Sequence, residues 1–179
     1  MKQNKKWVSF TVNCILMGSL ILSGKIFSQV SNKLQNVQNM NRNHYGRLTE
    51  AQFNPGIVRH FVAFKFKANI DQVQINKVIL NFLALKTLCV RNGKPYILSI
   101  EAGKANSFEG ADQGKQIGFL VTFKSEGDRN YYVGQPLIPE SEVDFYDPAH
   151  LKFKKFVGPL LETPVVPNGV YVFDFTLGK

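Results

Sequence analysis

Cysteine is nearly absent from this chain, which has only Cys14 and Cys89 among 179 residues. Cys14 lies in an apolar N-terminal run, and if export removes that run, a single thiol remains and no intramolecular disulfide can form. No Cys and His residues stand at the spacing of a zinc site, so the sequence predicts no metal site and no cofactor. The simplest role for Cys89 is a small buried hydrophobe near a helix end, and a nucleophile is the alternative.

The chain also lacks a stripe of Lys and Arg interleaved with aromatic residues, although its net charge is +9. Residues 1–56 contain seven basic residues and one acidic residue, a net charge of +6, which leaves +3 for the rest of the chain. Most of the basicity therefore lies outside the expected folded domain. This distribution argues against nucleic-acid binding.

The N-terminal apolar run is too short for a membrane-spanning helix, which needs about 20 apolar residues. It extends from Trp7 to Leu22, is interrupted by Asn13, and follows Lys2, Lys5 and Lys6. This is the layout of a secretory signal.

Three segments are predicted. Residues 1–28 are a signal peptide, residues 29–56 are an Asn- and Gln-rich extension or linker, and residues 57–179 are the folded domain. We therefore expect a secreted or periplasmic protein. An uncleaved leader that anchors the chain is the alternative, and it would be the one predicted membrane contact.

Phenylalanine is abundant by contrast, with 15 residues, and several of them alternate as in strands. In residues 57–67, the side chains of Val58, His60, Val62 and Phe64 share one face at a period of two. Further strands are predicted over residues 96–102, 116–124 and 170–176.

Two helices are predicted among these strands. The first shows helical spacing of apolar residues from Ile75 to Leu83, and Asn69 or Asp71 would cap it. The second begins with Asp147 as N-cap and Pro148 at the first helical position.

The order β-α-β-β-α-β predicts an α+β, ferredoxin-like fold, with an antiparallel sheet and its helices on one face. The other face of the sheet, if apolar, requires a partner. A second copy of the chain, forming a homodimer through this open face, is the simplest one.

In sequence order the chain contains VRHFVAFKFK, GKANSFEGADQG, GFLVTFKS, YDPAHLKFKKFVGPLL and VFDF. Together these segments resemble the stress-responsive A/B barrel domain family (Dabb) over residues 57–176. The resemblance implies the ferredoxin-like fold derived above, with two sheets paired into a dimeric α+β barrel.

A plant polyketide cyclase of this family uses a His-Pro-Ala-His motif, which is similar to residues 147–150. The second histidine matches His150, and Asp147 replaces the first. The family's first-strand histidine matches His60, while Ile117 replaces a frequent histidine of the third strand. Asp144 stands where the resemblance implies a catalytic tyrosine.

The catalytic candidates are therefore His150 and His60, with Tyr131 or Tyr132 in place of the missing tyrosine if residues 134–145 are an insertion. A ligand pocket beneath the His150 helix would be lined by Val62, Phe64, Tyr146, Phe153 and Val157.

His150 is a candidate general base, because the positive end of the helix dipole favours a neutral imidazole in the first turn. The alternative is a structural histidine that bonds the loop and packs on the sheet. His60, alone on an apolar strand face, has the same alternative. Lys152, Lys154 and Lys155 are predicted to form the solvated side of the helix.

The sequence thus supports two functions about equally. The first is binding of a small hydrophobic carbonyl compound, with proton abstraction or ring closure by His150. The second is a non-catalytic binding or stress-response module in which the histidines are structural.

Overall fold

The computed structural model describes residues 8–163 and 169–178. Lys2, Lys5 and Lys6 of the predicted leader lie outside the described residues, as do Pro167 and Asn168 of a predicted turn.

The first element is the helix α1, Val8–Leu48, which includes most of the predicted extension. The chain divides into two compact units, Met1–His44 and Tyr45–Lys179. Within the described residues, no helix combines the length and the apolar composition that crossing a membrane requires.

The second unit is built on a four-stranded antiparallel sheet with the order β4-β5-β1-β6. Its strands are β1 (Pro55–Phe64), β4 (Ser99–Lys104), β5 (Ile117–Ser125) and β6 (Val170–Thr176). The bounds of β6 are those predicted from the sequence, and the other predicted strands are confirmed with shifts at their ends.

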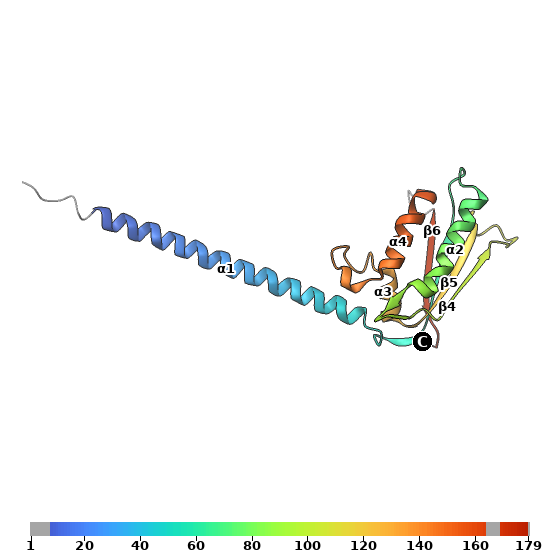
Figure 1. Cartoon of the computed structure of the whole chain (residues 1–179), viewed down its shortest axis with the longest axis horizontal. Helices are drawn as coiled ribbons and strands as arrows, with labels where there is room; N and C mark the ends of the chain where they lie inside the picture. Colours follow the sequence, from blue (N-terminus) through green and yellow to red (C-terminus); the bar gives the residue numbers. More distant parts are fainter. Residues whose placement is uncertain (1–7, 164–168, 179) are drawn as a thin grey trace, which may run out of the picture. The chain divides into compact units, whose positions relative to one another are not determined.

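Two helices pack against one face of this sheet (Figure 1). Helix α2, Gln72–Leu88, begins with a capping box between Asp71 and Gln74. Helix α4, Pro148–Val157, continues into the 3-10 turn η2, Gly158–Leu160.

Shorter elements complete the unit. They are the hairpin strands β2 (Val90–Arg91) and β3 (Lys94–Pro95), the helix α3 (Glu126–Val133) and the 3-10 turn η1 (Val143–Phe145). Helix α3 has Ser125 as its N-cap, whose hydroxyl accepts a hydrogen bond from the N–H of Asp128.

The core lies between the helices and the inner face of the sheet. Phe82 of α2 stacks on Phe119 of β5 with ring centroids 3.8 Å apart, and Phe153 of α4 meets Phe82 edge-on. Cys89, at the end of α2, is completely buried, as predicted.

The outer face of the sheet carries the other half of each strand's residues. Phe61 of β1 is paired with Phe173 of β6 and with Leu120 of β5. Phe173 is 53% exposed, and Tyr171 and Phe175 on the same strand are also exposed. The predicted α+β, ferredoxin-like fold is therefore confirmed, and the face away from the helices is apolar and open.

Candidate functional site

The start of α4 is fixed by Asp147, which is almost completely buried. Its Oδ1 accepts hydrogen bonds from the N–H groups of Ala149 and His150 at 2.8 and 3.0 Å. Its Oδ2 accepts a hydrogen bond from the hydroxyl of Tyr96 at 2.8 Å. The backbone of His150 is thus held by a carboxylate that is itself tied to the chain between β3 and β4.

The side chain of His150 is buried, and α3 holds its ring. Nδ1 lies 2.5 Å from the carbonyl oxygen of Tyr132. Because a carbonyl oxygen only accepts hydrogen bonds, Nδ1 carries the proton, and Nε2 keeps its lone pair in the neutral ring. No group in the described part of the chain forms a hydrogen bond with Nε2.

Burial, and after it the positive charge of Lys154, lowers the pKa of His150 to about 3, against the opposing effect of the Tyr132 carbonyl. The ring is therefore neutral at pH 7. Lys154 is half-buried and its Nζ donates a hydrogen bond to the carbonyl oxygen of Val133 at 2.8 Å. The prediction that Lys154 lies on the solvated side of the helix is wrong, because α3 covers that part of α4.

Tyr132 lies directly against His150. The two rings are stacked, with centroids 3.7 Å apart and an interplanar angle of 14°. The hydroxyl of Tyr132 is buried and has no hydrogen-bond partner among the described residues. Burial raises its pKa well above the usual value, so it remains an O–H donor.

His60 also lies against Tyr132, edge-on, with 5.7 Å between the ring centroids. Its Nδ1 is 2.6 Å from Oδ1 of Asp174 on β6, and the second carboxylate oxygen pairs with the guanidinium of Arg129. Burial alone would raise the pKa of Asp174, but the bonds to His60 and Arg129 lower it overall. The structure therefore brings His150, Tyr132 and His60 together in one buried cluster.

Tyr131 lies apart from this cluster. Its ring is 4.1 Å from the guanidinium carbon of Arg91 and 5.7 Å from the ring of Tyr96. Tyr146 is buried, and its hydroxyl donates to the carbonyl oxygen of Glu140 at 2.8 Å.

The remaining predicted pocket residues belong to the packed core. Val62, Phe64, Phe153 and Val157 are each buried against neighbouring apolar side chains. The cavity that adjoins Tyr132, Tyr146 and Asp147 measures about 10 Å³, the size of one water molecule. A hollow of about 630 Å³ lies on the opposite, outer face of the sheet.

The residues described by the structure contain no group of three or more His, Cys, Asp and Glu side chains that could hold a metal ion. Burial raises the pKa of the Cys89 thiol, and the nearby charge of Asp147 raises it further. A protonated thiol is a poor nucleophile, which favours the structural role of Cys89.

Comparison with known protein families identifies the family of this chain. The profile of the Stress responsive A/B Barrel Domain, Dabb, matches residues 58–177, which is well over half of the chain. The chain belongs to this family. Among curated proteins, none matches the sequence.

Solved structures similar to this A/B barrel domain have the same ferredoxin-like fold. Hydroxynitrile lyase from Passiflora edulis is 24% identical with a TM-score of 0.51, over 70% of this chain and 96% of the lyase. The Arabidopsis thaliana protein At3g17210 is 22% identical with a TM-score of 0.50, over 66% and 93%. A dimeric ferredoxin-like protein of unknown function from Jannaschia sp. CCS1 is 16% identical with a TM-score of 0.50, over 68% and 100%.

The departures from the family's histidine pattern have clear structural roles in this A/B barrel domain. Asp147, in place of a histidine, caps α4 and accepts the Tyr96 hydroxyl. Ile117, in place of another, is a buried core residue opposite Phe64.

Sequence reasoning missed Asp174, the partner of His60, and Arg129, the second partner of Asp174. Along the chain, 114 residues separate Asp174 from His60 and 45 separate it from Arg129. One signal was available for Asp174. It is a lone carboxylate in the apolar strand VYVFDFT, on the face shared with Val170 and Val172, where an acid needs a buried partner.

Proposed function

We propose that this stress-responsive A/B barrel domain protein transfers a proton on a small apolar carbonyl compound, with His150 as the base. The observation that carries the proposal is the state of the His150 ring. It is buried and neutral, its Nδ1 is held by a carbonyl oxygen, and its Nε2 has no hydrogen-bond partner among the described residues. A general base requires such a free lone pair.

The hydroxyl of Tyr132 supplies the second group. It is a buried donor without a partner in the described chain, and it adjoins the His150 ring. In the proposed step, Nε2 of His150 takes a proton from the carbon next to the carbonyl group. The electrons of that C–H bond form an enolate, whose oxygen accepts a hydrogen bond from Tyr132. The imidazolium exchanges its Nε2 proton with solvent and then protonates the same carbon, which regenerates the ketone and the neutral ring of His150.

A histidine with a pKa near 3 is a weak base in the unliganded protein. Negative charge that develops on a bound enolate would stabilise the imidazolium beside it and raise this pKa during the reaction. A substrate would reach the ring by displacing the connection between α3 and α4, residues 134–147, which contributes Gly134, Gln135, Tyr146 and Asp147 to the wall of the small cavity.

The test uses 2-nonanone in D₂O, with NMR detection of deuterium at the carbons beside the carbonyl. Wild-type protein is expected to accelerate exchange, and His150→Gln to reduce the protein-dependent rate by about 100-fold or more. His44→Gln, at an exposed histidine of α1, is the matched control and should exchange like wild type. Equal rates for wild type and His150→Gln, or no acceleration by wild type, would reject the catalytic role.

A specific observation favours the second candidate, a binding or stress-response module with structural histidines. The space beside the cluster is only about 10 Å³, and Nδ1 of each histidine is already bonded. In that case His150→Gln lowers the stability of the protein but changes neither the exchange rate nor the affinity for the ketone.

We also propose that the chain forms a homodimer through the outer face of the sheet. The exposed side chains of Tyr171, Phe173 and Phe175 support this, because apolar side chains that lie together on a surface mark interaction sites. The similar structure from Jannaschia sp. CCS1 is described as dimeric, which supports a dimer.

A further inference from the structure

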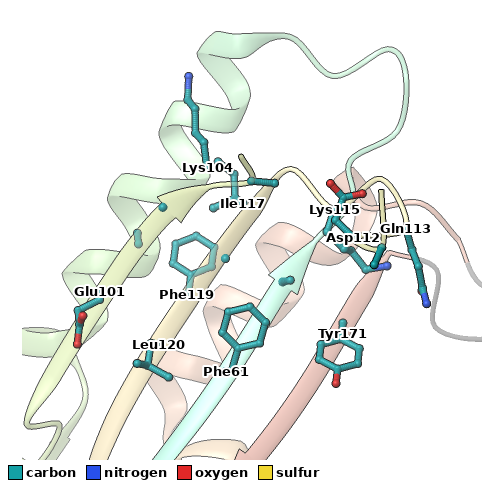
Figure 2. Close-up of a pocket in the computed structure, with 16 residues that line it drawn as sticks. Phe61, Glu101, Lys104, Asp112, Gln113, Lys115, Ile117, Phe119, Leu120 and Tyr171 are labelled. Carbon is teal, nitrogen blue, oxygen red and sulfur yellow. The ribbon is translucent and has the colours of Figure 1, made fainter. Parts of the chain in front are cut away.

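The outer face of the sheet contains a hollow of about 630 Å³, within the range of about 300–1,000 Å³ that is typical of small-molecule pockets. Its apolar walls come from the sheet, through Phe61, Leu120 and Tyr171 (Figure 2). Its far end is formed by the connection between β4 and β5, which includes Ala111 and Lys115. The His150 cluster lies on the other face of the sheet, so the two sites are separate.

Small residues create this hollow. Gly118 of β5 is paired with Ala63 of β1 on one side and with Gly103 of β4 on the other, so three neighbouring strands lack bulky side chains at the same level. The ring of Phe61 lies across Gly118, where an added Cβ would come within 3.1 Å of it. The apolar floor is thus shaped by backbone and by an aromatic ring.

Lys115 makes the hollow favourable for a negatively charged group. It is only 8% exposed, yet its ammonium group has no hydrogen bond or ion pair with any residue that the structure describes. Its stem is covered and its ammonium group remains accessible to solvent, so an anion bound in the hollow can serve as its counter-ion through a charge-assisted hydrogen bond.

The acidic side chains that line the same hollow do not serve as that counter-ion. Glu101 lies 3.9 Å from Arg59, and Oδ1 of Asp112 accepts a hydrogen bond from the N–H of Gly114 at 2.8 Å. Figure 2 shows Glu101 at the opposite edge of the hollow from Lys115. Lys104, also in the wall, is exposed and can be solvated by water.

We propose that this hollow binds an amphipathic carboxylate, with its carboxylate group paired to Lys115 and its apolar body on Phe61, Leu120 and Tyr171. The proposal is independent of proton transfer at His150, because no residue of the His150 cluster lines the hollow. It is compatible with the proposed homodimer, in which the ligand would lie between the two sheets.

The experiment measures binding of decanoate to the full chain by isothermal titration calorimetry, with decanol as the uncharged probe of equal chain length. Decanoate is expected to bind with one site per chain and about tenfold more tightly than decanol, as a charge-assisted hydrogen bond implies. Lys115→Met should weaken decanoate binding about tenfold and leave decanol binding unchanged. Lys115→Arg should retain the preference for decanoate.

Two control variants make the result specific. Lys124→Met removes the same charge from an exposed position of β5 outside the hollow, and it should bind decanoate like wild type. His150→Gln should also bind normally, which separates failure of the proton-transfer proposal from failure of this one. Circular dichroism checks that each variant is folded.

Three results would overturn the proposal. One is the absence of saturable decanoate binding to wild type. Another is an equal loss in Lys115→Met and Lys124→Met, which would indicate only long-range attraction by net charge. The third is loss of binding in His150→Gln with normal binding in Lys115→Met, which would place the ligand on the helix side of the sheet.

Discussion

His150 and His60 are both buried, and the partner of Nδ1 distinguishes their chemistry. The neutral carbonyl of Tyr132 holds His150, whereas the carboxylate of Asp174 holds His60 and is itself paired with Arg129. A carbonyl oxygen fixes the tautomer of a ring without adding a charge, whereas a carboxylate places a negative charge beside the ring. This difference favours His150 as the base and His60 as a structural residue of the same cluster.

The low pKa of His150 has a consequence for stability. Its pKa is about 3 in the folded protein and about 6.5 in an unfolded chain, so below pH 6.5 the unfolded state binds more protons. The contribution of His150 is complete above about pH 6.5 and is lost as the pH falls toward 3. Urea unfolding between pH 7 and pH 4 should show wild type losing up to about 1.4 kcal/mol per pH unit more than His150→Gln.

Asp174, which also titrates in acid, is unchanged in both proteins, so its contribution is common to the two curves. Parallel curves for wild type and His150→Gln would show that His150 has an ordinary pKa in the folded state, against a buried neutral ring.

At the scale of elements, α4 depends on one buried carboxylate. Asp147→Ala removes the acceptor for two N–H groups and leaves the buried hydroxyl of Tyr96 without its partner. Loss of the cap and of the partner together should lower the free energy of unfolding by about 2–4 kcal/mol. Chemical denaturation measures this loss.

The N-cap of α2 is the matched comparison. Asp71 is exposed and caps its helix in the same way, so Asp71→Ala should cost about 1 kcal/mol. A loss in Asp147→Ala no larger than the loss in Asp71→Ala would mean that the bond from Tyr96 contributes nothing.

Helices and strands could be predicted where preferences of neighbouring residues in the sequence determine them. The cap at Asp147 and the whole of β6 follow from capping preferences and from alternation. Capping preferences left Asn69 and Asp71 open for the first helix, and the structure has Asp71. The strand predicted at residues 96–102 is displaced to β4, Ser99–Lys104, because Tyr96 and Ile97 enter the core before the strand begins.

The sites were less predictable, because they depend on contacts between distant segments. His150 could be selected from its helix position and from the family resemblance, but Tyr132 and Tyr131 could not be told apart. The structure places Tyr132 against His150 and Tyr131 against Arg91. The outer hollow depends on the register that aligns small residues of three strands, which no single segment reveals.

At the scale of the whole molecule, the two faces of the sheet differ in what covers them. Its inner face is closed by α2 and α4 around a dense aromatic core, and its outer face leaves large apolar side chains exposed to water. Each exposed ring is unfavourable for a solitary chain, and pairing of two outer faces would remove the rings from water. The hollow with Lys115 then becomes enclosed between subunits.

The proposed dimer can be tested through Phe173, which is 53% exposed at the centre of β6 and does not line the hollow. Sedimentation at micromolar concentration should give twice the chain mass for wild type and a single chain mass for Phe173→Asp, because burying an unpaired carboxylate in an apolar interface is unfavourable. Val73→Asp, at an exposed apolar position of α2, should stay dimeric. A monomeric wild type, or dissociation of both variants alike, would contradict pairing through the outer face.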